Sequence, residues 1–127
     1  MQHIDDLQIY LLIKLKKFKR FLIKEGEMIK TFRHITALFY KKDIDAIFEQ
    51  REHLLRNAPT NPNMHNPKYH KYYELIWYSE FLIAYNDNKN AKYRIKIANE
   101  LLKNLNRWHE LGLAIENQVI ALIPTCT

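Results

Sequence analysis

The stretch that decides the fold is KYHKYYELIWYSEFLIAY, residues 68–85. Its apolar and aromatic side chains occur at nearly every position around a helix, and Pro67 suits an early position of that helix. Such a helix is buried on several sides, or is buried on one side and available to a partner on another. We expect its tyrosines to lie in the core or at a protein interface, with stacking on nucleic-acid bases as the alternative.

Helical patterns also precede this stretch. Residues 4–40 carry apolar side chains at steps of three and four, which predicts a long amphipathic helix interrupted only by Gly26. A second helix is expected over residues 44–56, with Asp43 as its N-cap. Alternatively, the chain continues helically through residues 41–42 and the first two helices are one.

The chain after residue 85 shows the same kind of pattern. A loop rich in proline and asparagine over residues 57–67 precedes the aromatic helix, and a short turn over residues 86–90 follows it. Apolar steps of three and four then predict one long final helix over residues 89–123, ended by Pro124. The sum is an all-α fold, an elongated antiparallel helical bundle of three to four helices, two of them long, in a single helical domain over residues 1–127.

The composition supports this fold class. The chain is 47% hydrophobic and 27% charged, which is typical of a folded protein rather than a disordered one. Only two glycines and four prolines argue against a sheet built on tight hairpins. A single cysteine, Cys126, allows neither an intrachain disulfide nor a multi-cysteine zinc site. The N-terminal stretch resembles neither a signal peptide nor a membrane span, so we expect a soluble, cytoplasmic protein.

The motifs of common enzyme classes are missing from the sequence. The six histidines form no His–His pair at metal-binding helical spacing, and the Glu49–His53 pair is typical of a solvated helix. His65 and His70 flank Pro67 and are interpreted as ordinary histidines at a loop boundary. The arginine–histidine spacing of the HEPN ribonucleases and a phosphate-binding loop are both missing. We therefore expect no enzyme, no catalytic residues, no metal and no cofactor.

Positive charge is concentrated in two segments. The net charge of the chain is +6, with 8 basic and 2 acidic residues (+6) over 11–33, and 6 basic and 1 acidic (+5) over 89–107. These faces could bind a nucleic-acid backbone, or they could be the solvated sides of amphipathic helices. The candidate nucleic-acid-binding residues are Lys14, Lys16, Lys17, Lys19, Arg20, Lys24, Lys92, Arg94 and Lys96.

Residues 32–56, FRHITALFYKKDIDAIFEQREHLLR, resemble flagellar type III export chaperones of the FlgN/FliT type. The similarity lies in an amphipathic helix, a charged turn before Asp43, and a second helix ending in Leu54-Leu55. The resemblance implies that an apolar face of the final helix holds an amphipathic helix of an export substrate. Such chaperones tend to be acidic, whereas this chain carries +6. The candidate partner-binding residues are Leu101, Leu105, Trp108, Ile115, Val119 and Leu122, which could equally be core residues.

These features predict a non-enzymatic helical protein-binding module, an export chaperone or adaptor that holds an amphipathic helix of another protein. The alternative is a small basic helical subunit of a nucleoprotein complex, such as the small subunits of CRISPR effector complexes. Assembly into a homo-oligomer through the aromatic helix is compatible with either function. An immunity or inhibitor role is also compatible with a sequence that carries no motif of its own.

Overall fold

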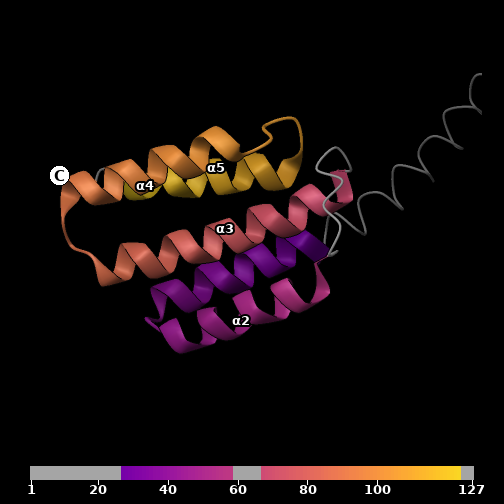
Figure 1. Cartoon of the computed structure of the whole chain (residues 1–127), viewed down its shortest axis with the longest axis horizontal. Coiled ribbons are helices and arrows are strands. Elements are labelled where there is room, and N and C mark those ends of the chain that lie inside the picture. The colour runs from indigo at the N-terminus through magenta and orange to yellow at the C-terminus, as the bar shows by residue number, and fades with distance from the viewer. Residues whose placement is uncertain (1–26, 59–66, 124–127) are drawn as a thin grey trace, which may run out of the picture.

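The computed structural model describes residues 27–58 and 67–123, which form five helices and no strand (Figure 1). A helix over residues 27–40 is followed by α2 (Ile44–Asn57), α3 (Pro67–Asp87), α4 (Ala91–Asn104) and α5 (Glu110–Leu122). The all-α prediction is therefore confirmed. Residues 1–26, which include residues 4–26 of the expected first helix, residues 59–66 of the expected loop, and Pro124 and Cys126 lie outside the described residues.

The first turn matches the sequence prediction. Asp43 is the N-cap of α2, and its carboxylate accepts a hydrogen bond of 3.3 Å from the Ala46 amide. Lys42 has a φ of 61°, in the left-handed region, which turns the chain out of the preceding helix. The amide of Asp43 donates back to the Leu38 carbonyl at 2.9 Å. The alternative of one helix running through residues 41–42 is wrong.

The prediction of one long final helix over residues 89–123 is also wrong, because the chain turns between α4 and α5. Inside this turn, the side-chain oxygen of Asn106 accepts a hydrogen bond from the Trp108 amide, and His109 Nδ1 accepts one from the Gly112 amide. The turn comes so close to α5 that a Cβ atom on Gly112 would lie 1.8 Å from the Asn106 carbonyl oxygen. The described part of the chain is consequently a bundle of five helices instead of three to four.

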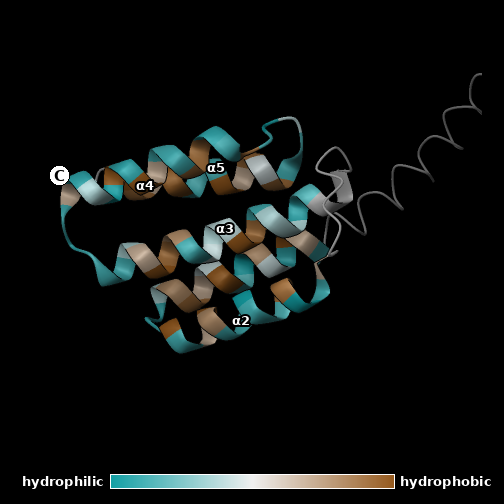
Figure 2. Ribbon diagram, viewed as in Figure 1, coloured by the Kyte–Doolittle hydropathy of each residue, from teal (hydrophilic) through white to brown (hydrophobic). Residues whose placement is uncertain are grey.

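Helix α3 is the centre of the bundle. It contacts α2 on one side and the α4–α5 pair on the other, and Figure 1 shows it between these two layers. Leu75, Tyr78 and Leu82 on α3 are fully buried, together with Ile35 of the first described helix and Ile115 of α5. Burial on both sides explains why apolar and aromatic residues occur on more than one face of α3; Figure 2 shows brown and pale segments among teal ones along its length.

A buried polar contact joins α3 to the first described helix. The hydroxyls of Tyr78 and Thr36 share a hydrogen bond of 2.6 Å. Burial raises the pKa of the Tyr78 hydroxyl far above its usual range, and the hydrogen bond to Thr36 offsets part of that rise. The Tyr78 hydroxyl therefore stays protonated, and its hydrogen bond links α3 to the first described helix without placing a charge in the core.

Among the helices of residues 27–58 and 67–123, none combines the length and the apolar character that a membrane span requires.

Candidate functional site

One strip of α3 forms the floor of a groove between its neighbours, with Phe81 buried and Trp77 and Ala84 half-buried. Trp77, Glu80, Phe81 and Ala84 lie along this strip, one helical turn after another. We call this hollow the α3 groove. On the α4 side, its wall is formed by Ile97, Glu100, Leu101 and Asn104.

The α3 groove continues past Glu80 and Ala84 toward α2. Phe48 and Arg51 of α2 form its wall there, and Tyr93 of α4 stands opposite. Phe48 is 45% exposed and Tyr93 is 39% exposed, although both rings are mostly apolar. Two exposed aromatic rings beside an apolar floor are typical of a surface that binds a partner.

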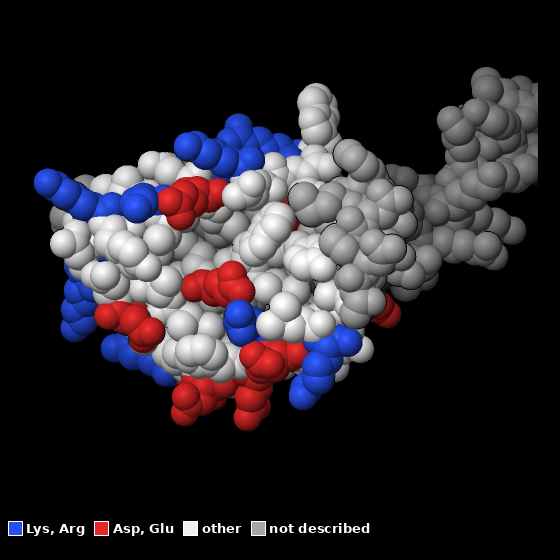
Figure 3. All heavy atoms as spheres, viewed as in Figure 1, with Lys and Arg blue, Asp and Glu red and all other residues white. Residues whose placement is uncertain are grey.

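The α3 groove is acidic although the protein as a whole is basic. Its lining carries three carboxylates, on Glu80, Asp87 and Glu100, and one guanidinium, on Arg51. Arg51 forms an ion pair of 2.9 Å with Glu80 and another of 3.0 Å with Glu52, so its charge is already partly compensated. Figure 3 shows acidic side chains in the middle of this face, while basic side chains gather mainly toward its periphery.

The six predicted partner-binding residues do not form one surface. Five of them are buried in the core, and only Leu101 among these also reaches the α3 groove. Trp108 is the exception, because it is 96% exposed on the turn between α4 and α5. The buried residues are Leu101, Leu105, Ile115, Val119 and Leu122.

The groove residues Trp77, Phe81 and Ala84 were not among the predicted site residues. The signal for them was the apolar circumference of α3, which indicated either full burial or a second, partner-facing side. The sequence pattern could not separate the two, because the α3 groove depends on how far apart α2 and α4 lie.

The predicted nucleic-acid-binding residues fall into three groups. Those between Lys14 and Lys24 lie outside the described residues. Lys92 and Lys96 are exposed on α4. Arg94, by contrast, is half-buried: its Nε donates to the carbonyl oxygens of Tyr85 and Asn88 at 3.0 and 2.7 Å, and its guanidinium lies 3.9 Å from the Tyr85 ring centre. Arg94 therefore stabilises the turn between α3 and α4.

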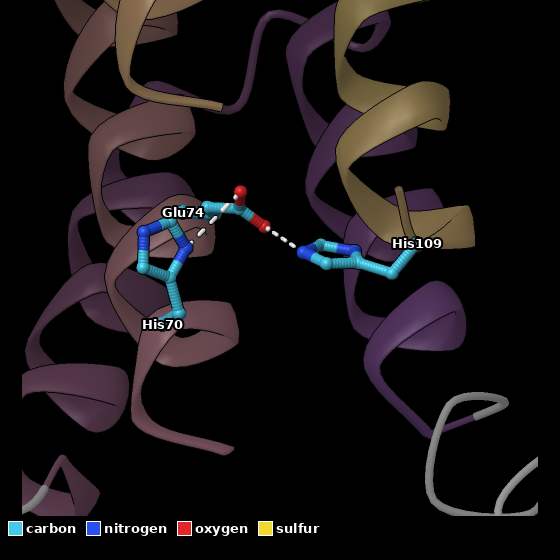
Figure 4. Close-up of side chains that lie close together, drawn as sticks. All are labelled: His70, Glu74 and His109. Atoms are coloured by element: carbon cyan, nitrogen blue, oxygen red, sulfur yellow. Dashed lines mark ion pairs between the residues drawn. The ribbon is translucent and has the colours of Figure 1, made fainter. Parts of the chain in front are cut away.

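A cluster of polar side chains lies where α3 meets the turn between α4 and α5. The fully buried carboxylate of Glu74 sits between His70, one turn earlier on α3, and His109, the N-cap of α5 (Figure 4). Its Oε1 accepts a hydrogen bond of 2.6 Å from the Asn106 amide. The same oxygen lies 3.3 Å from His70 Nδ1, and Oε2 lies 3.0 Å from His109 Nε2.

This cluster corrects the interpretation of His70 as an ordinary histidine at a loop boundary. His70 lies on α3 itself, with its ring edge against Trp77 at 6.1 Å between ring centres. The spacing of His70 and Glu74, four residues apart on one helix, was a usable signal. No sequence pattern predicts that His109 lies beside Glu74, because the position of His109 depends on the turn between α4 and α5.

Comparisons with protein-family models, with curated proteins and with solved structures return no match to this chain.

Proposed function

We propose that the protein is a helical binding module whose α3 groove holds an amphipathic helix of a partner protein. The observation that carries this proposal is the α3 groove, whose floor of Trp77, Phe81 and Ala84 is flanked by exposed aromatic rings and by carboxylates. The bound helix would place apolar side chains on Trp77, Phe81 and Ala84. Lysine or arginine side chains beside that apolar face would meet Glu80, Asp87 and Glu100.

The dimensions of the α3 groove suit such a ligand. From Trp77 to Asp87 the floor rises through ten residues, or about 15 Å at 1.5 Å per residue. That length accommodates about three turns of a bound helix, with contacts at positions i, i+3 or i+4, and i+7. The walls come from two different helices, α2 and α4, so the ligand would be held from both sides.

The resemblance to flagellar export chaperones supports the same mode of binding. Those proteins hold an amphipathic helix in an apolar groove, and they tend to be acidic. This chain departs from them in its net charge of +6, but its groove lining carries three carboxylates against one guanidinium. We extend the proposal accordingly to a non-enzymatic chaperone or adaptor that acts in the cytoplasm.

The test uses Trp77 as a reporter. The chain has two tryptophans, so Trp108→Phe leaves Trp77, on the groove floor, as the only one. In that background, a designed peptide with apolar residues at i, i+3, i+4 and i+7 and flanking lysines should shift the Trp77 emission saturably. The same peptide with glutamates in place of the lysines should bind at least about tenfold more weakly, because it repels the carboxylates.

Matched variants assign the binding to the groove. Ala84→Arg fills the floor at a half-buried position and should abolish the peptide-induced shift, whereas Leu113→Arg, at an exposed position of α5, should leave it unchanged. Equal affinity for the Ala84→Arg variant would overturn the proposal. The proposal would also be overturned if the protein sedimented as a dimer and Ala84→Arg dissociated that dimer, since the groove would then bind a second copy of this chain.

Binding to a nucleic-acid backbone is the second candidate, favoured by the exposed lysines Lys92 and Lys96 on α4. It predicts tight binding of labelled RNA or DNA at about 50 mM salt that collapses at about 200 mM. Lys92→Gln combined with Lys96→Gln should weaken such binding without affecting the peptide titration. Peptide binding through an apolar groove should depend far less on salt.

A further inference from the structure

The His70–Glu74–His109 cluster presents three metal-ligand side chains around one buried point. Figure 4 shows the two imidazole rings on opposite sides of the Glu74 carboxylate, each with a nitrogen directed toward it. One ligand atom from each residue can be chosen so that all three lie within 4.8 Å of one another. Glu74 is completely buried, and only a small part of the His109 side chain is exposed.

Hydrogen bonds within the described residues account for only part of this arrangement. His70 Nδ1 is buried and makes no hydrogen bond there, although it lies 3.3 Å from Glu74 Oε1, and Glu74 Oε2 faces His109 Nε2 at 3.0 Å. The 3.3 Å contact between His70 Nδ1 and the carboxylate oxygen is favourable only when a proton or another positive charge lies between the two atoms. A buried carboxylate likewise requires a compensating charge. A cation coordinated by all three side chains would supply that charge.

We propose that His70, Glu74 and His109 bind a divalent transition-metal ion, with Zn²⁺ as the best match. Two imidazole nitrogens and one carboxylate are ligands that zinc prefers. Zinc bonds to nitrogen and oxygen of roughly 2.0–2.2 Å place neighbouring ligand atoms of a tetrahedron about 3.3 Å apart. The contacts of 3.3 and 3.0 Å, one to each oxygen of the Glu74 carboxylate, are close to that spacing, and the three ligand atoms together lie within 4.8 Å of one another.

The position of His109 gives the proposed site a structural signature. Its Nδ1 accepts the Gly112 amide hydrogen, so without metal its ring proton is on Nε2, facing Glu74. Coordination through Nε2 moves that proton to Nδ1, and the hydrogen bond to the Gly112 amide is lost. Metal binding at this site therefore changes the first turn of α5. Three protein ligands would also leave a fourth tetrahedral position for water.

The test is a titration of the chelator-treated full-length protein with Zn²⁺ against a chromophoric competitor, and with Co²⁺ for its visible spectrum. We expect one ion per chain and a tetrahedral Co²⁺ spectrum. His70→Gln and His109→Asn should each weaken binding by at least about tenfold. Asparagine is a good N-cap residue, so His109→Asn removes the ligand while α5 keeps its cap. His53→Gln, at an exposed histidine four residues after Glu49, is the matched control and should change nothing.

A second readout follows Gly112 directly. The chain contains two glycines, so selective glycine labelling gives two amide signals, and the Gly112 signal should move when Zn²⁺ is added. Zn²⁺ should also raise the unfolding temperature of the wild-type protein but not of the His70→Gln variant. The proposal is overturned if the wild type binds Zn²⁺ no more tightly than the His70→Gln variant, or if the Gly112 signal does not respond to bound metal.

Discussion

Two of the turns in this bundle reverse the chain by different means. The turn at residues 41–43 is local: Lys42 adopts a left-handed conformation and Asp43 caps the helix that follows it. The turn at residues 105–109 depends on a distant residue, because Glu74, which precedes Asn106 by 32 residues, accepts the Asn106 amide hydrogen. A turn of the first kind can be found in a sequence window, whereas one of the second kind forms only when α3 is already in place.

Among the variants that compare the two turns, we expect the largest loss of stability for Gly112→Ala. Alanine normally stabilises a helix relative to glycine by up to about 1 kcal/mol. Here the added Cβ would lie 1.8 Å from the Asn106 carbonyl oxygen and 2.8 Å from its carbon, both backbone atoms, so the turn has to move. We expect the free energy of unfolding, measured in urea, to fall by about 3 kcal/mol, at the upper end for overpacking.

The control for this variant is Asn117→Ala, at an exposed position on the same helix. It should change the free energy of unfolding by less than about 0.5 kcal/mol. If Gly112→Ala were neutral or stabilising, the close approach of the turn to α5 would not constrain the fold.

An intermediate effect is expected for Glu74→Leu, measured in the presence of a chelator. Leucine fills much of the same space, but it leaves the Asn106 amide without its acceptor and removes the carboxylate that faces His109. The free energy of unfolding should fall by about 2 kcal/mol. Glu74→Gln retains an oxygen acceptor and should lose only about half as much. A leucine variant as stable as the wild type would show that the distant residue does not hold this turn.

The smallest effect is expected at the local turn. Asp43→Ala removes the side-chain acceptor for the Ala46 amide and should lower the free energy of unfolding by about 1 kcal/mol. Asp43→Asn, which preserves the cap, should remain within a few tenths of a kcal/mol of the wild type. A loss at Asp43→Ala larger than that at Glu74→Leu would reverse the ranking and make the first turn the more dependent on its surroundings.

The candidate site shows the same limit of sequence reasoning. The apolar circumference of α3 indicated burial on several sides, or burial on one side with a partner-facing side on another, and the structure shows the helix buried between two layers. The choice of Leu101, Leu105, Ile115, Val119 and Leu122 as partner-binding residues followed the apolar stripe of an expected single helix. Once that helix is folded back on itself, the stripe faces inward and those five side chains are buried. Which strip of α3 forms the groove floor is a property of the spacing of α2 and α4.

The all-α class, the cap at Asp43 and the apolar circumference of the aromatic helix follow from the sequence alone. Each of these depends on side chains within a few residues of one another, so the helical period reveals them. Only the tertiary structure decided the break between α4 and α5, the α3 groove and the meeting of His70, Glu74 and His109. The apolar steps of three and four run on through residues 105–109 without interruption. At the break, the Asn106 amide donates its hydrogen bond to Glu74, which lies 32 residues earlier in the chain.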